Sequence, residues 1–241
     1  MIQFQDLVKG FGPKQVLQGL TLEVREGETM VIIGFSGTGK SVALKHIVGL
    51  LHPDAGEVIV DGRAVSTLDR EGLTGLRREI GYVFQFAALF DSMTVADNVA
   101  LGLRRRGLSE EEIADRVREA LALVDLTGSD DTMPAELSGG MRKRVGIARA
   151  IALRPRYLLY DEPTTGLDPV TSAVIDQLMV RTREHLGVTG VVVTHDMRSA
   201  YTVGDRIAML YEGRIRQVGT VEEIQGTDDP VVRQFIEGRP A

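Results

Sequence analysis

The chain has 241 residues, a formal net charge of −6 and no cysteine, with 43% hydrophobic and 26% charged residues. This composition is that of an ordinary globular protein, and the length suits one large domain or two small ones. The missing cysteines exclude a disulfide-stapled fold, and the acidic balance disfavours a general nucleic-acid binder, whose surface is usually basic. No apolar stretch approaches the ~20 residues of a membrane-spanning helix, and the N-terminus lacks a signal-peptide pattern.

Short strands with alternating apolar and polar residues open the chain. They cover Ile2–Phe4, Leu20–Val24 and Glu57–Val60, and the last of them precedes the turn dipeptide Asp61-Gly62. A period of two predicts an antiparallel sheet with one face in water. Met30–Ile33 is apolar throughout, which instead predicts a buried strand.

The loop after this buried strand fits the pattern G-x-x-x-x-G-K-[ST], with the sequence GFSGTGKS at residues 34–41. Its glycines permit backbone angles that turn successive N–H groups toward an anion, and the helix predicted from Ser41 to Val48 adds a positive N-terminal end. We expect Lys40 to reach the terminal phosphates and Ser41 to bind Mg²⁺. The predicted nucleotide-binding residues here are Gly34, Ser36, Gly37, Thr38, Gly39, Lys40 and Ser41. A flexible connector is the alternative, which the flanking strand and helix disfavour.

The middle of the chain has the periodicity of helices, and the last part alternates strands with helices. Ser109 followed by Glu110–Glu112 is a capping-box pattern, and an apolar stripe at helical spacing follows it. The later apolar runs are Tyr157–Tyr160, Val191–Thr194 and Ile207–Leu210. Continuous apolar strands between helices indicate a parallel sheet covered on both faces. The predicted fold class is α/β: residues 1–241 form one domain with a mainly parallel core, an antiparallel β layer and a helical insertion at about 86–155.

Two acidic residues follow the strand at 157–160. We expect Asp161 to hold Mg²⁺ through its water shell, because that ion keeps waters and takes few carboxylates. Glu162 is expected to polarise an attacking water as general base. Two solvated acids at a strand end are the alternative.

A second glycine-rich segment, LSGGMRKR at residues 137–144, precedes a helix-like run to Leu153. Ser138 fits a helix N-cap, and Gly139 and Gly140 leave backbone N–H groups uncovered. This predicts a second anion site at a helix start. Two such sites for one nucleotide make sense if two copies of the chain face each other.

These motifs, in this order, resemble the ATP-binding domain of ABC transporters over nearly the whole chain. Walker A is 34–41, the Q-loop glutamine is Gln85, the signature is 137–141, Walker B is 157–161, the D-loop is 165–168 and the switch histidine is His195. The resemblance implies a P-loop NTPase of the ABC-ATPase fold, with antiparallel β and inserted helical subdomains. It also implies a homodimer that sandwiches two ATP molecules and hydrolyses them with Mg²⁺.

The same resemblance assigns roles by position. Phe11 would stack on adenine, with a core phenylalanine as the alternative. Gln85 would contact Mg²⁺ or the lytic water, and His195 would donate to the γ-phosphate. Asp168 joins the nucleotide-binding set through the D-loop. We expect catalysis to depend on Glu162, His195 and Gln85.

Three stretches are similar to a narrower group, the Mla-type, MCE-associated lipid transport ATPases. They are the signature ending on Met141, where the family commonly has glutamine, and the segments 84–100 and 229–238. The similarity implies movement of phospholipid between inner and outer membranes to maintain outer-membrane asymmetry. It implies a permease dimer, a periplasmic MCE-domain subunit and a small STAS-domain subunit as partners, with this chain peripheral on the cytoplasmic face of the inner membrane.

Two surface features accompany this interpretation. Phe86–Phe90 is apolar and is expected to dock the permease, with burial in the core as the alternative. Arg104–Arg106 is expected to form a solvated face near the membrane, within reach of anionic lipid.

Other functions stay open at this point. The chain is alternatively an ABC ATPase for another transported substrate, or an ABC protein of DNA repair or translation, although the short spacing between its motifs and the acidic balance disfavour nucleic acid as a partner. A clamp with negligible turnover is a third hypothesis, and the presence of both Glu162 and His195 argues against it.

Overall fold

The computed structural model describes residues 1–239. Contacts divide the chain into two units, one made of Met1–Arg77 with the chain from Thr189 onward, and the other of Arg78–Val188. The loop at 34–41 and His195 belong to the first unit. Gln85 and the signature belong to the second, together with the acidic pair at 161–162.

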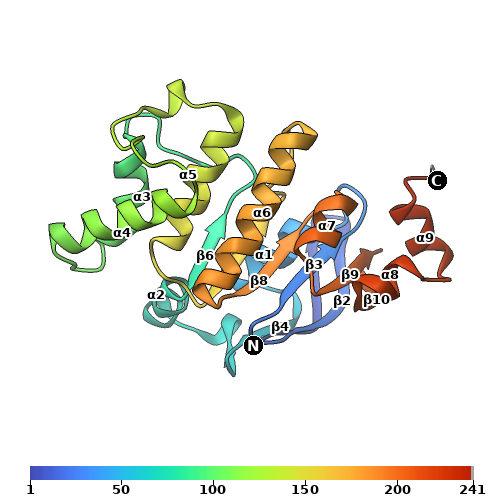
Figure 1. Cartoon of the computed structure of the whole chain (residues 1–241). Helices are drawn as coiled ribbons and strands as arrows, with labels where there is room; N and C mark the ends of the chain where they lie inside the picture. The colour runs from blue at the N-terminus through green and yellow to red at the C-terminus, as the bar shows by residue number, and fades with distance from the viewer. Residues whose placement is uncertain (240–241) are drawn as a thin grey trace. The chain divides into compact units, whose positions relative to one another are not determined.

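The first unit holds two groups of strands (Figure 1). An antiparallel sheet has the order β2-β1-β4-β5, with β1 (Ile2–Phe11), β2 (Lys14–Val24), β4 (Ala55–Val60) and β5 (Arg63–Ala64). In the other group β3 (Thr29–Ile33) pairs in parallel with both β8 (Thr189–Val193) and β9 (Arg206–Tyr211). β10 (Arg214–Thr220) pairs antiparallel with β9. Every residue of β3 is buried, which is why Met30–Ile33 forms an unbroken apolar run in the sequence.

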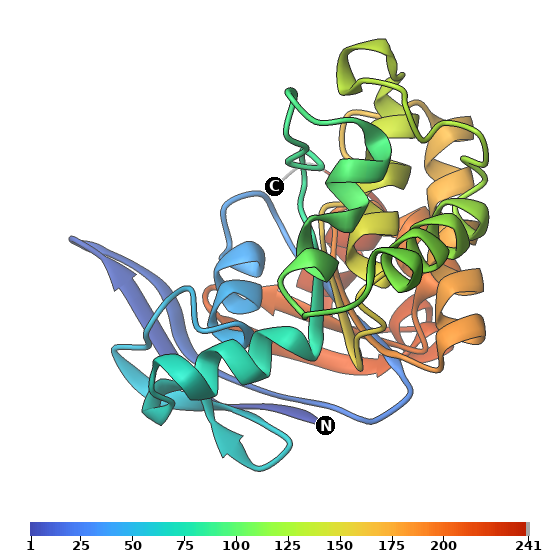
Figure 2. The ribbon, with the colours of Figure 1, turned by 90° about the vertical axis from the view of Figure 1, so that its left-hand side faces the viewer.

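The helices described in this unit lie between these strands along the chain or follow the last of them. They are α1 (Lys40–Ile47), α2 (Arg70–Arg78, whose last residue falls in the second unit), α7 (Met197–Val203), α8 (Val221–Gln225) and α9 (Pro230–Ile236), with a 3-10 turn at Val65–Thr67. The hairpin of β1 and β2, dark blue in Figure 2, is longer than the sequence pattern predicts.

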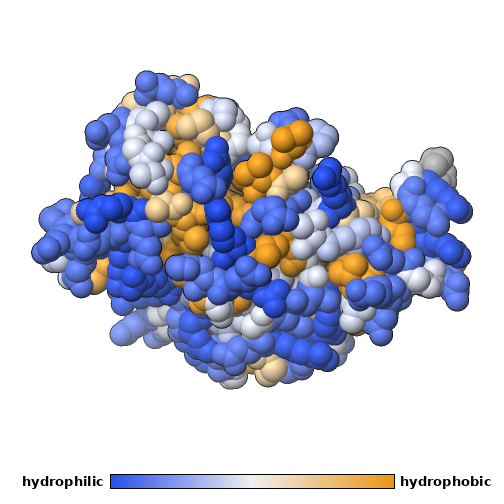
Figure 3. Space-filling view, in the orientation of Figure 1, coloured by the Kyte–Doolittle hydropathy of each residue, from blue (hydrophilic) through white to orange (hydrophobic). Residues whose placement is uncertain are grey.

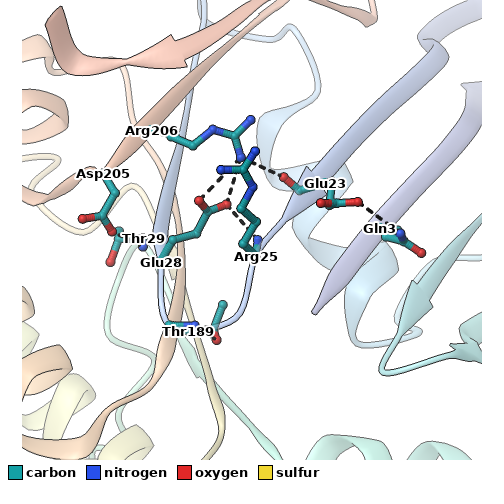
Figure 4. Close-up of polar contacts among 9 residues, drawn as sticks. Gln3, Glu23, Arg25, Glu28, Thr29, Thr189, Asp205 and Arg206 are labelled. Carbon is teal, nitrogen blue, oxygen red and sulfur yellow. Dashed lines mark hydrogen bonds and ion pairs between the residues drawn. The ribbon is translucent and has the colours of Figure 1, made fainter.

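Charged hydrogen bonds fix the start of β3 (Figure 4). Glu28 accepts from the backbone N–H of Arg25 at 2.8 Å and from the guanidinium of Arg206 at 3.2 Å. Asp205 accepts from the N–H of Thr29 at 2.7 Å. Only 9% of Glu28 is exposed, so these partners offset the cost of burying its charge. They hold the end of β3 opposite the glycine-rich loop.

The second unit is mostly helical. Its strands β6 (Ile80–Val83) and β7 (Tyr157–Asp161) pair in parallel. Its helices are α3 (Val95–Arg104), α4 (Glu110–Leu123), α5 (Gly139–Ile151) and α6 (Pro169–Leu186), with a 3-10 turn at Pro134–Glu136. Helices α3, α4 and α5, green to yellow in Figure 1, pack together.

The local signals for these helices are confirmed. The N–H of Glu112 donates to the hydroxyl of Ser109 and the N–H of Ser109 donates to the Glu112 carboxylate, as a capping box requires. The apolar stripe after it is buried. Parallel strand pairs, an antiparallel β layer and a helical segment together confirm the predicted α/β fold class.

Candidate nucleotide-binding site

The glycine-rich loop leaves β3 at Gly34 and enters α1 at Lys40. Gly34, Gly37 and Gly39 have φ angles of 153°, 77° and 105°. A Cβ at Gly34 would lie 2.4 Å from the carbonyl oxygen of Leu210, and one at Gly39 would lie 2.7 Å from a methyl carbon of Val16. The loop therefore needs glycine for both its backbone angles and its close packing.

Lys40 holds this loop together from inside. Lys40 is only 6% exposed, and its ammonium donates to the carbonyls of Gly34 at 2.8 Å and Phe35 at 3.2 Å. The hydroxyl of Thr38 also donates to the Phe35 carbonyl, at 2.9 Å. The first turn of α1 carries no acidic residue, so its positive end stays available to an anion. Ser41 stands in that turn and is half-buried, whereas Ser36 is exposed.

His195 leaves the same sheet edge as this loop. Ile32 of β3 pairs with Val193 of β8, and the N–H of Thr194 donates to the Ile32 carbonyl at 3.2 Å. Parallel strands end at a common edge, so Gly34 and His195 both emerge there. His195 is exposed, and the residue after it, Asp196, caps α7.

Phe11 lies at the end of β1, next to the hairpin turn. It is 46% exposed, and the Lys9 ammonium lies 5.7 Å from the centre of its ring. The alternative of a core phenylalanine is therefore wrong, and an exposed ring leaves the adenine-stacking prediction standing.

In the second unit, Gln85 and Asp161 leave a common sheet edge in the same way. Val83 of β6 pairs with Tyr160 of β7, and both strands run in parallel. Asp161 and Glu162 are 7% and 9% exposed, so the alternative of two solvated acids is wrong. Burial of adjacent carboxylates is costly unless they are hydrogen-bonded.

Hydroxyl groups supply those hydrogen bonds. The Tyr82 hydroxyl donates to a carboxylate oxygen of Asp161 at 3.0 Å, and the Thr165 hydroxyl donates to Glu162 at 3.1 Å. Burial, and then the charge of Asp161, raise the pKa of Tyr82 well above its usual value, so the phenol keeps its proton and donates. Glu162 has a φ of 50°, an uncommon angle for a residue other than glycine.

Lys143 is a supporting residue that the sequence analysis does not identify. It is 6% exposed, and its ammonium donates to the carbonyl of Gln85 and, at 3.4 Å, to that of Glu162. Burial lowers the pKa of Lys143, and the charges of Glu162 and Asp161 act in the opposite direction. Lys143 lies three positions after the buried Gly140 and therefore on the same, inner face of α5. This helical spacing is the signal in the sequence that could have identified it. We call Tyr82, Gln85, Lys143, Asp161 and Glu162 the carboxylate corner.

The signature segment forms a helix start as predicted. Ser138 is the N-cap of α5, and its hydroxyl accepts from the N–H of Met141 at 3.2 Å. Gly139 is exposed, whereas a Cβ at Gly140 would lie 2.5 Å from a methyl of Thr171 on α6. Glycine at 140 therefore lets α5 approach α6 closely, while Ser138 and Gly139 at the helix start are exposed.

Asp168 caps the next helix. Its carboxylate accepts from the Thr171 hydroxyl and from the N–H groups of Val170 at 2.9 Å and Thr171 at 3.0 Å. The Thr171 hydroxyl lowers the pKa of Asp168 most, and the two N–H groups lower it further. The residue is exposed. The structure thus gives it a capping role, and its part in nucleotide binding stays a prediction.

Two predictions about the surface need correction. Phe86 and Phe90 are 84% and 52% exposed, but Ala87 is buried against Gly146 of α5, so the apolar stretch is only partly available for docking. Exposed apolar side chains also occur along α6, where Figure 3 shows apolar surface: Val170 is 76% exposed and Val174 is 43% exposed.

Arg104–Arg106 do not form one solvated face. Arg104 pairs with Asp97 at 2.6 Å, but the Arg106 guanidinium turns inward and donates to the carbonyls of Leu153, at 2.9 Å, and Arg78. Burial lowers the pKa of Arg106. Arg106 is therefore hydrogen-bonded to two backbone carbonyls and does not belong to a solvated arginine face.

A family model described as ABC transporter matches residues 17–165. This match spans more than half of the chain. The chain belongs to the ABC transporter family. It is an ATPase and the ATP-binding subunit of a transport complex. Walker A, Gln85, the signature and Walker B fall within the matched residues, and His195 lies beyond them.

Members of the family are similar in sequence to this chain over almost its full length. A probable ribonucleotide transport ATP-binding protein, mkl, of Mycobacterium tuberculosis is 43% identical over 239 residues, covering 99% of this chain and 67% of the relative. The methionine import ATP-binding protein MetN of Xylella fastidiosa is 44% identical, covering 98% and 72%. The chloroplastic protein TRIGALACTOSYLDIACYLGLYCEROL 3 of Arabidopsis thaliana is 41% identical, covering 99% and 74%.

Solved structures share the fold. The ATP-binding cassette MJ0796, dimeric in a post-hydrolysis state with ADP and Pi, has a TM-score of 0.83 and 37% identity, covering 92% of this chain and 99% of that one. The cbiO1 protein of Clostridium perfringens, part of the ABC transporter complex cbiONQ, has a TM-score of 0.87 and 31% identity, covering 99% and 94%. The predicted fold and ATPase activity are therefore confirmed.

The oxygen donors predicted for Mg²⁺ suit that ion. Ser41 offers a hydroxyl, Asp161 a buried carboxylate and Gln85 an amide, all hard oxygen ligands of the kind Mg²⁺ takes alongside phosphate and water. No cluster of three or more carboxylate, histidine or cysteine side chains suited to a metal occurs among residues 1–239. A site shared with the phosphates of a nucleotide does not require one.

Among the helices described for residues 1–239, none combines the length and apolar composition that crossing a membrane takes.

Proposed function

We propose that two copies of this chain hydrolyse ATP with Mg²⁺ to drive a membrane permease that moves phospholipid between the inner and outer membranes. The observation that carries the catalytic part is the burial of Glu162 in a hydrogen-bonded carboxylate corner, beside the carboxylate expected to hold Mg²⁺. A glycine loop with an internal ammonium supplies the phosphate-binding part.

The roles of the residues follow from their chemistry. The N–H groups of the loop and Lys40 bind the β- and γ-phosphates, and Ser41, Asp161 and Gln85 would hold Mg²⁺, which neutralises charge on the phosphate oxygens. Glu162 takes a proton from the water that attacks the γ-phosphorus, and the bond to the leaving ADP oxygen breaks. His195 donates to the γ-phosphate during transfer.

The second copy completes the site in this proposal. Ser138 and Gly139 are exposed at the start of α5, the buried Gly140 follows them, and the positive end of a helix attracts an anion. The dimeric state of the MJ0796 cassette supports pairing of two chains across nucleotide. Asp168, in the D-loop, would also contact this nucleotide, and Phe11 would stack on its adenine.

Phospholipid is proposed as the substrate on two grounds. The signature ending on Met141 and the segments 84–100 and 229–238 are similar to Mla-type lipid transport ATPases. The Arabidopsis relative carries the name of a glycolipid. We infer a permease dimer, an MCE-domain subunit, a STAS-domain subunit and a place on the cytoplasmic face of the inner membrane; the cbiONQ complex supports assembly with other subunits.

The names of the mycobacterial and Xylella relatives favour a second candidate, which is transport of a polar metabolite such as a ribonucleotide or methionine. Detergent extraction of the natively expressed chain separates the two. Co-purification of an MCE-domain protein and phospholipid supports lipid transport. Co-purification of a permease with a solute-binding protein, with no MCE-domain subunit, contradicts it.

The catalytic assignment is tested by Glu162→Gln. Steady-state phosphate release should fall about 10²- to 10⁴-fold, the usual contribution of a general base, while ATP binding persists. The control is Glu184→Gln, an exposed carboxylate on α6, which should keep its turnover. Unchanged turnover in Glu162→Gln would remove this residue from the reaction.

A further inference from the structure

An aromatic ring in the phosphate loop contacts the last helix of the described chain. Phe35 follows Gly34 directly, and its ring meets Phe235 of α9 edge-on, with centroids 5.0 Å apart and planes at 80°. The Phe35 ring also lies 6.4 Å from that of Tyr211, at the end of β9. Both separations fall in the range of favourable edge-to-face pairs. Position 35 is variable in the phosphate-binding motif, so its side chain is free to serve another purpose.

Helix α9 is firmly attached where it presents this ring. Asp229 caps the helix through the N–H groups of Val231 at 2.9 Å and Val232 at 3.1 Å, and pairs with Arg216 of β10 at 2.8 Å. Val232 is fully buried. Figure 1 shows α8 and α9 following β10 at the end of the chain. Phe235 therefore approaches the loop from a fixed support.

The backbone carbonyl of Phe35 also accepts hydrogen bonds from side chains of the loop itself. Its carbonyl accepts from Lys40 at 3.2 Å and from the Thr38 hydroxyl at 2.9 Å. A ring fixed by α9 thus fixes the carbonyl that sets the position of the phosphate-binding ammonium. The family match ends at residue 165, so α9 lies outside the matched segment.

We propose that α9 braces the phosphate loop and that Phe235 is a positioning residue for ATP binding. The edge-to-face pair holds Phe35, and through it the loop backbone, in the geometry that accepts the triphosphate. Preorganisation of this kind lowers the cost of ordering the loop when nucleotide binds. The inference rests on the proposed role of the loop and of Lys40 in binding phosphate.

The first test is ATP binding by the full chain carrying Phe235→Ala. The dissociation constant should rise about 2- to 12-fold, the range that an aromatic pair supports, whereas turnover at saturating ATP should change little. Phe235→Tyr, which keeps the ring, should restore binding. Ile236→Ala is the matched control, because it removes a half-buried apolar side chain from the same helix and should leave affinity unchanged.

A double-mutant cycle with Phe35→Leu and Phe235→Leu tests the contact itself, and the leucines preserve folding if the alanine variant unfolds. The two effects on affinity should be non-additive, the double variant binding about as well as either single one. Additive effects, unchanged affinity or tighter binding would overturn the brace. Lys40→Met separates this from the proposed function: if it abolishes ATP binding while the cycle is additive, the inference fails and the function stands.

Discussion

The glycine loop and the carboxylate corner are built in different ways for one predicted nucleotide. The loop depends on its own backbone, because glycine angles and one internal ammonium shape residues that are adjacent in sequence. The corner depends on side chains brought from far along the chain: Tyr82 to Asp161 spans 79 positions and Lys143 to Gln85 spans 58. A local motif therefore specifies the first region, whereas tertiary folding must deliver the second.

The largest effect is expected when a side chain is added to the glycine loop, which tests whether the loop depends on its own backbone. Gly34→Ala places a Cβ 2.4 Å from the Leu210 carbonyl, so we expect loss of ATP binding and a large drop in unfolding free energy. Gly37→Ala meets open space and should cost only the left-handed backbone penalty of about 1–2 kcal/mol. Urea unfolding and ATP titration of both variants measure the difference. Equal losses would mean that close packing at Gly34 is unimportant.

Lys143→Met should damage the corner and spare the loop. It leaves the part-buried carbonyl of Gln85 and the buried carbonyl of Glu162 without this donor, a cost of about 1–3 kcal/mol, so turnover should fall about 5- to 150-fold with ATP affinity retained. Arg144→Met is the control, since that side chain donates to carbonyls away from the corner. Weakened ATP binding with normal turnover would contradict the distinction.

Tyr82→Phe should produce a smaller effect in the same region. It removes one hydroxyl donor from Asp161, a change of about 0.5–1.5 kcal/mol, and turnover should fall about 2- to 12-fold. Because burial raises the pKa of Tyr82, the phenol donates across the working pH range, and the ratio of wild-type to variant turnover should not vary with pH. Tyr160→Phe, on the neighbouring strand, is the control. A ratio that changes with pH would contradict a permanently protonated phenol.

The smallest effect concerns His46, on the helix that follows the loop. Burial, more than the charge of Lys9, lowers its pKa from 6.5. The unfolded chain then binds a proton more readily than the folded one, so the stability contribution is full above pH 6.5 and is lost as the pH falls. Urea midpoints should therefore drop more steeply on acidification in wild type than in His46→Gln. Identical pH slopes would show that His46 titrates alike in both states.

The sequence predicts the backbone-built parts of this fold well. The buried strand β3, the glycine loop, and the caps at Ser109 and Ser138 all follow from local spacing. The β1–β2 hairpin extends beyond its prediction, to Phe11 and from Lys14, because pairing between strands continues past the alternating pattern and shifts register along the way. Strand β10 was not predicted, since it is mostly polar and is defined by its pairing with β9.

Supporting side chains are harder to predict. A lysine, a tyrosine or a phenylalanine in a helix or strand has many possible partners, and only folding selects among them. Lys143 stands beside the signature glycines, yet its hydrogen bonds go to the backbone carbonyls of Gln85 and Glu162. Phe35 and Phe235 lie far apart in the sequence, and no periodic pattern predicts their contact.

The central claim is that the loop of one chain and the signature of another bind the same ATP. Mixing two inactive variants, Lys40→Met and Ser138→Arg, tests it directly by phosphate release. A mixed dimer contains one site with an intact loop and an intact signature, so the mixture should recover hydrolysis that neither variant shows alone. Absence of recovery in demonstrated mixed dimers, or full activity of Ser138→Arg by itself, would contradict the shared site.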